Sequence, residues 1–141
     1  MVSIALYNLK GGVGKTAATI NLAYLAAADG YKTLVWDLDP QASSSFYLNA
    51  TPTIKNESKK LLTGELELTD AVQDSMFENL WVIPSDLSAR NADVVLDEMK
   101  KAKRNCETLF RKQKILILYL LIVRRGFHCC MKIFFTPPIG Y

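Results

Sequence analysis

The sequence has no apolar run long enough to cross a bilayer. The longest run, at residues 115–123, has nine residues before Arg124 and Arg125 interrupt it, whereas a membrane-spanning helix needs about 20. The first ten residues have neither the basic start nor the small-residue cleavage site of a secretory signal. We therefore expect no membrane segment and a cytoplasmic location.

Cysteine and histidine are also scarce. The three cysteines, Cys106, Cys129 and Cys130, include an adjacent pair and an odd one, which fits no disulfide framework and suits a reducing compartment. The single histidine, His128, directly precedes the pair, but contiguous His-Cys-Cys lacks the ligand spacing of a tetrahedral metal site. The sequence therefore predicts neither a disulfide scaffold nor a metal centre of this kind.

Acidic residues are absent from residues 113–141, where four of the 17 basic residues lie. All 14 acidic residues precede this segment, so the net charge of +3 for the whole chain becomes −1 over residues 1–112. Residues 99–114 carry seven basic side chains and one acidic one, a pattern most typical of a solvated helix face, with nucleic-acid contact as the alternative. The overall basicity is thus weak support for a nucleic-acid partner.

Half of the residues are apolar and 22% are charged, which predicts a globular domain. Residues 2–9 are almost continuously apolar and end at a glycine cluster, which is typical of a buried parallel strand. An alanine-rich helix is predicted over residues 16–30 and is closed by Gly30. Residues 32–39 predict a second buried strand that ends in two carboxylates. Together these segments form a βαβ unit.

The remaining segments continue the alternation of strands and helices. The polar segment 41–79 predicts short helices around residues 58–62 and 69–74, and residues 80–86 predict a third strand stopped by a proline. Residues 88–110 have the three- and four-residue apolar spacing of an amphipathic helix. We therefore predict a doubly wound, mostly parallel α/β sheet with helices on both faces and ligands at the carboxyl ends of its strands.

The stretch NLKGGVGKT, residues 8–16, has the composition of a phosphate-binding loop. Glycines let successive backbone N–H groups turn inward, and the following helix adds the partial positive charge of its N-terminus. Lys15 can reach terminal phosphates, and the Thr16 hydroxyl can ligate Mg²⁺. A glycine-rich turn without a ligand is the alternative, but the position between an apolar strand and a helix favours phosphate binding.

The strict pattern G-x-x-x-x-G-K-[ST] fails because Leu9 occupies its first position, whereas the variant K-G-G-x-G-K-T fits. With INLA at 20–23, DLDPQ at 37–41 and IPSD at 83–86, this loop resembles the ParA/MinD family of deviant Walker A P-loop ATPases over residues 1–112. The resemblance implies a P-loop NTPase fold and an ATPase activity used in plasmid or chromosome partition or in protein positioning.

The resemblance also implies roles for individual residues. Lys10 would reach across a dimer interface to the phosphates held by the other subunit, as an arginine finger does. Asp39 would orient the attacking water and hold the magnesium shell, and Asp37, two positions earlier, could share that environment. The expected ATP contacts are Lys10, Gly11, Gly12, Val13, Gly14, Lys15, Thr16 and Ala17, with Lys10, Lys15 and Asp39 catalytic and Thr16 and Asp39 at Mg²⁺.

The implied partners belong to the full-length family member. They are a second copy in an ATP-dependent homodimer, a partner protein of the partition complex and non-specific DNA.

The tail departs from the family pattern, which requires an apolar strand that ends in an aspartate. Here the run at 115–123 ends in RRGFHCC and no acidic residue follows. Read one base out of register, the tail permits DCPPG directly after the run, so we hypothesise a single-base deletion near Arg111–Lys114. Residues 1–112 would then be the amino-terminal part of the ATPase domain, and 113–141 an apolar strand plus an out-of-frame tail. The alternatives are a non-catalytic product of a broken gene and a small P-loop phosphotransferase.

Overall fold

The computed structural model describes residues 4, 6, 10–91 and 116–120. Its four strands form one sheet in the order β2-β3-β1-β4. The central strand β1 pairs in parallel with β3 on one side and β4 on the other, and β2 pairs antiparallel with β3 at the edge. The predicted mostly parallel sheet is therefore confirmed. The strands are β1 Thr33–Asp37, β2 Gln73–Asp74, β3 Leu80–Ile83 and β4 Leu116–Leu120.

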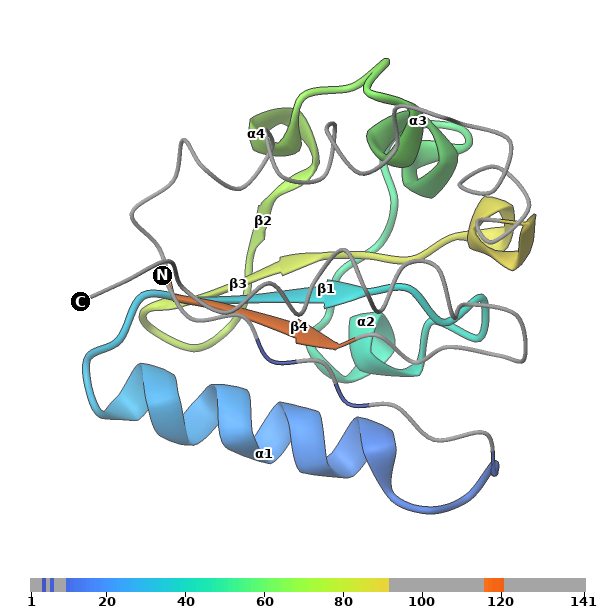
Figure 1. Cartoon of the computed structure of the whole chain (residues 1–141). Coiled ribbons are helices and arrows are strands. Elements are labelled where there is room, and N and C mark those ends of the chain that lie inside the picture. The colour runs from blue at the N-terminus through green and yellow to red at the C-terminus, as the bar shows by residue number, and fades with distance from the viewer. Residues whose placement is uncertain (1–3, 5, 7–9, 92–115, 121–141) are drawn as a thin grey trace, which may run out of the picture.

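Helices lie on both sides of this sheet (Figure 1). The long helix α1 runs along one face, and α3 and α4 lie on the other side, while α2 follows the carboxyl end of β1. No helix within the described ranges is both long and apolar enough to cross a bilayer. The helices are α1 Lys15–Ala28, α2 Ser43–Tyr47, α3 Glu57–Thr63, α4 Leu68–Ala71 and the 3-10 helix η1 Leu87–Asn91.

The packing of α1 on β1 brings the carboxyl end of the strand to the start of the helix. Ala23 and Ala27 are buried on the inner face of α1, where their small side chains allow close approach to Val35 and Val82. All five residues of β1 are buried, as predicted for a strand covered on both faces. The helix ends before Gly30, which has φ +86° and supplies the left-handed turn back into the sheet.

Trp36 lies fully buried near the end of β1 and pairs in register with Ile83 of β3. Strand β4 pairs with β1 along its whole length, and its last residue, Leu120, pairs with Asp37. The apolar run at 115–123 thus contributes a strand to the sheet beside β1, as its composition predicts.

Several predicted boundaries differ from the structure. The predicted helix at 69–74 is wrong at its end, because residues 73 and 74 form β2 along the edge of β3. Helix α2 was not predicted at all. The strand expected at 2–9 lies outside the described residues except for positions 4 and 6, and of the helix expected at 88–110 only the part within η1 is described.

Candidate functional site

The glycine loop is an open turn at the start of α1. Gly12 and Gly14 have φ of +71° and +81°, left-handed values that L side chains rarely adopt. Gly14 is the N-cap of α1 and its carbonyl accepts the Ala18 N–H at 2.8 Å. No side chain of the described residues caps this helix end. The N–H groups of the first turn are therefore left for an anion.

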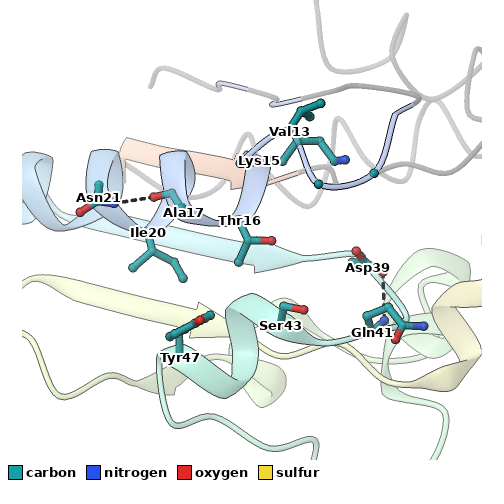
Figure 2. A pocket seen from close by; sticks show the side chains of 13 residues that line it. Val13, Lys15, Thr16, Ala17, Ile20, Asn21, Asp39, Gln41, Ser43 and Tyr47 are labelled. Carbon is teal, nitrogen blue, oxygen red and sulfur yellow. Dashed lines mark hydrogen bonds between the residues drawn. The ribbon is translucent and has the colours of Figure 1, made fainter.

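A pocket of about 680 Å³ opens between this loop, the first turns of α1 and the segment after β1 (Figure 2). Its volume is typical of a small-molecule site. The pocket collects every predicted loop residue from 11 to 17 together with Asp39. The lining residues are Gly11, Gly12, Val13, Gly14, Lys15, Thr16, Ala17, Ile20, Asn21, Asp39, Gln41, Ser43 and Tyr47.

The two loop lysines occupy different places. Lys15 lines the pocket, and its Nζ donates a hydrogen bond to the backbone carbonyl of Lys10 at 3.2 Å. This contact holds the Lys15 ammonium at its own loop. Lys10 is exposed and is not part of the pocket lining. Its predicted role in a second subunit therefore stays a prediction.

Thr16 and Asp39 approach the pocket from opposite sides, the first from α1 and the second from the segment after β1 (Figure 2). Asp39 Oδ1 accepts the Gln41 N–H at 2.9 Å, a local turn that fixes the carboxylate. A hydroxyl and a carboxylate are hard oxygen donors of the kind that Mg²⁺ prefers. The described residues contain no group of three or more histidine, cysteine or acidic side chains that could hold a metal. Thr16 and Asp39 together supply two oxygen donors, which fits a Mg²⁺ ion that takes its remaining ligands from phosphates and water.

Asp37 does not share this environment, and the expectation that it would is wrong. Its side chain is fully buried and is not part of the pocket lining. Oδ1 accepts the Asp39 N–H at 3.0 Å, and Oδ2 accepts both the N–H and the hydroxyl of Ser45 at 2.9 Å. Burial raises the pKa of the Asp37 carboxyl, and the hydrogen bonds from Ser45 and Asp39 oppose that shift.

Five lining residues were missed by the sequence analysis, namely Ile20, Asn21, Gln41, Ser43 and Tyr47. The first two lie one turn beyond the loop on α1, where Asn21 Nδ2 donates to the Ala17 carbonyl at 2.7 Å. The other three follow β1, and two of them belong to α2. Three of the five had a usable signal, since Gln41 belongs to the quoted DLDPQ motif and Ile20 and Asn21 belong to the quoted INLA motif.

Comparisons with known proteins agree with this geometry. The model of a family described as AAA domain matches residues 1–122. The chromosome partitioning protein ParA of Caulobacter vibrioides is 35% identical over 96 residues, which are 67% of this chain and 36% of that protein. The chain thus spans only about a third of the length of this relative.

Two solved structures share the fold. A Cyanothece McdA–ATP complex superposes with a TM-score of 0.74 at 24% identity, over 85% of this chain and 47% of that one. The cobyrinic acid a,c-diamide synthase of Mycobacterium smegmatis, with bound ADP and magnesium, gives 0.73 at 22% identity, over 84% and 49%. These likenesses show the P-loop NTPase fold, here incomplete. Together with the family match and the ParA relative, they show that the chain belongs to the ParA-like family of P-loop ATPases.

Proposed function

We propose that the chain binds ATP with Mg²⁺ in the loop pocket and is the amino-terminal portion of a cytoplasmic ATPase of plasmid or chromosome partition or protein positioning. The observation that carries this proposal is the open glycine turn, which faces Asp39 across one pocket. The McdA complex with ATP and the synthase complex with ADP and magnesium support the choice of ligand.

The phosphate end of the nucleotide would lie on the backbone N–H groups from Gly11 to Ala17. Lys15 would exchange its hydrogen bond to the Lys10 carbonyl for one to a phosphate oxygen, where both partners are charged and the contact is therefore stronger than one to a neutral acceptor. Thr16 and Asp39 would hold the Mg²⁺ ion directly or through its water shell. The ion, when bound, would neutralise charge on the phosphate oxygens.

Hydrolysis would need two further groups from the protein, one to orient the attacking water and one to stabilise the charge of the transition state. Asp39 lines the same pocket as Thr16 and would orient the attacking water. Lys10 would act on the nucleotide of a second copy, since a cation supplied in trans stabilises the charge that develops during phosphoryl transfer. An ATP-dependent homodimer, a partner protein of the partition complex and non-specific DNA are proposed for the full-length protein only.

A second candidate is a non-catalytic nucleotide-binding product. It is favoured by the sequence after β4, because residues 121–141 contain no acidic residue to hold the magnesium shell. Under this candidate a shift of reading frame near Arg111–Lys114 separates the two parts of the chain, and binding occurs without turnover.

Calorimetric titration of ATP with Mg²⁺ tests the proposal. We expect binding by the wild-type chain and a loss of affinity of about 10-fold or more for Lys15→Ala, because a charged hydrogen bond is worth about 1.5–3 kcal/mol. Lys32→Ala is the matched control, since Lys32 is exposed and outside the lining. Absence of wild-type binding refutes the proposal.

Phosphate release measured on the same samples separates the candidates. Turnover favours the ATPase, whereas binding without turnover favours the non-catalytic product. ADP formation that requires an added small acceptor would instead indicate a phosphotransferase.

A further inference from the structure

One buried carboxylate holds both ends of the pocket-lining segment 39–45. Oδ1 of Asp37 accepts the N–H of Asp39 at 3.0 Å, where the segment leaves β1. Oδ2 accepts the N–H and the hydroxyl of Ser45 at 2.9 Å each, in the first turn of α2. The three pocket residues Asp39, Gln41 and Ser43 therefore lie between two anchors on the same side chain.

The second anchor is itself tied to the neighbouring strand. Ser45 Oγ accepts the N–H of Ser85 at 2.9 Å, two residues after the end of β3. Asp37, Ser45 and Ser85 are each at most 1% exposed, so water does not compete for these hydrogen bonds. The network thus joins the carboxyl ends of β1 and β3 to α2.

We propose that Asp37 is a positioning residue, which acts with Ser45 and Ser85 to set the distance between Asp39 and the glycine loop. The proposal rests on the proposed binding of ATP and Mg²⁺ in this pocket. Asp37 touches neither ligand in this scheme and works only through the segment it holds. This role differs from the metal contact that its position in the motif had suggested.

The network and the glycine loop are separate in their contacts. None of the hydrogen bonds of Asp37 or Ser45 reaches residues 11–17, and Gly14 and Lys15 are held within their own loop and helix. Loss of the network should therefore weaken the Asp39 side of the pocket, where Mg²⁺ is expected. The phosphate contacts of the loop should stay intact.

The test is the ratio of ATP dissociation constants without and with Mg²⁺, measured by calorimetry. We expect Asp37→Asn and Ser45→Ala to lower this ratio by about 10-fold, the usual cost of removing a residue that orients a metal ligand. The affinity for Mg²⁺-free ATP should stay at the wild-type value. A purely structural defect would lower both affinities together.

Two matched controls come from the same chain. Ser44→Ala removes an equally buried hydroxyl from the same helix, and this hydroxyl has no hydrogen-bond partner among the described residues. Glu57→Gln changes a second buried carboxyl, which is not part of the pocket lining. Both variants should keep the wild-type ratio.

Amide hydrogen exchange of the nucleotide-free chain gives a readout independent of the ligand. Ser45 and Ser85 amides should lose protection in Asp37→Asn, and the Ser85 amide in Ser45→Ala.

An unchanged ratio in folded Asp37→Asn and Ser45→Ala overturns the positioning role, as does an equal loss with and without Mg²⁺. If Asp37→Asn does not fold, Ser45→Ala decides by the same criteria. Failure of the proposed function is distinct, because then the wild-type chain itself binds no ATP, and the positioning role is refuted with it.

Discussion

Asp37 and Glu57 are buried carboxylates that serve as hydrogen-bond acceptors for backbone N–H groups. Glu57 Oε2 accepts the N–H groups of Thr53 and Ile54 at 3.1 Å, while its Oε1 has no partner among the described atoms. A buried acceptor without a partner carries an unrecovered desolvation cost. The Glu57 carboxyl is therefore better suited to the protonated form than an exposed glutamate.

The free energy of unfolding should therefore depend on pH through the Glu57 carboxyl. Burial raises the pKa of Glu57 above its ordinary value of 4.5, the N–H groups of Ile54 and Thr53 oppose the shift, and Asp86 adds to it. Above pH 4.5 the folded state keeps a proton that the unfolded state loses, so this contribution to the free energy of unfolding falls until the pH passes the raised pKa.

Glu57→Gln should remove that dependence. Urea unfolding from pH 4 to pH 7 is expected to show wild type losing stability relative to Glu57→Gln as the pH rises. Glu78→Gln, at an exposed position, is the control and should stay within about 0.5 kcal/mol of wild type. A difference between wild type and Glu57→Gln that does not change with pH would contradict the prediction.

The left-handed glycines Gly14 and Gly30 can be tested by substitution with alanine. Gly14→Ala and Gly30→Ala both place a Cβ on a residue with positive φ, and in both cases no atom of the described residues beyond the immediate chain neighbours lies within 4 Å of that Cβ. Each should lose about 1–2 kcal/mol of unfolding free energy through backbone strain alone. Only Gly14→Ala should also weaken ATP binding, because its Cβ projects beside the phosphate cradle. Equal ATP affinity in the two variants would argue against that cradle.

Among the elements, the short helices α2 and α3 are capped by carboxylates that lie outside the helices, eight residues from the capped N–H in α2 and 29 residues from it in α3. Their own N-cap residues, Ala42 and Asn56, make no side-chain capping bond. Asp37 accepts the N–H of Ser45 in α2, and Asp86 accepts the N–H of Glu57 in α3 at 2.7 Å. Such caps are formed by the tertiary structure and leave no local sequence signal.

This explains which elements could be predicted. Helix α1 and strands β1 and β3 could be predicted, because their apolar patterns, and Gly30 at the end of α1, are local features of the sequence. Helix α2 has the sequence SSSFY, which is weak in helix propensity, so its start depends on Asp37. The helix predicted at 69–74 extends too far, because residues 73 and 74 pair with β3 instead, a contact that no local pattern encodes.

The candidate site was predicted to a similar extent. The loop and Asp39 follow from motif chemistry, whereas Ser43 and Tyr47 enter the pocket only through α2. The burial of Asp37 depends equally on how α2 packs against the sheet.

The cap on α3 can be tested directly. Asp86 also accepts the N–H of Ser88 at 2.9 Å and the hydroxyl of the same residue. Asp86→Ala should therefore destabilise the chain by about 1 kcal/mol, the usual value of a helix cap, measured by urea unfolding. Asp29→Ala, at an exposed position, is the control and should change stability by at most about 0.5 kcal/mol. Equal stabilities of the two variants would show that the α3 cap contributes nothing.

For the whole molecule, the partial length of the chain matters most. The matched residues span 36% of the ParA relative, and the sheet has β2 and β4 at its two edges within the described part. Strand β4 pairs with β1, and the resemblance to the ParA/MinD family implies that this apolar run should end in an aspartate. A change of reading frame after residue 112 would preserve its apolar character but not that aspartate.

Restoring one base in the Arg111–Lys114 codons tests this account. We expect the longer product to form a dimer with ATP in sedimentation experiments and to release phosphate. Lys10→Ala in that product should lower turnover by about 10³-fold or more, as the loss of a trans cation does, with Lys32→Ala as the matched control. The account would be contradicted by a stop codon in the restored frame shortly after the repaired position. It would also be contradicted if Lys10→Ala left the turnover unchanged.

The buried indole of Trp36 gives the molecule a built-in optical probe. It lies one residue before the carboxylate that anchors the pocket segment, and it is fully shielded from solvent. The other tryptophan, Trp81, is only partly buried in β3, so Trp81→Phe would leave Trp36 as the single emitter. Its fluorescence would then report any change in the surroundings of β1 next to Asp37 when ATP and Mg²⁺ are added, in unlabelled protein and without a coupled assay.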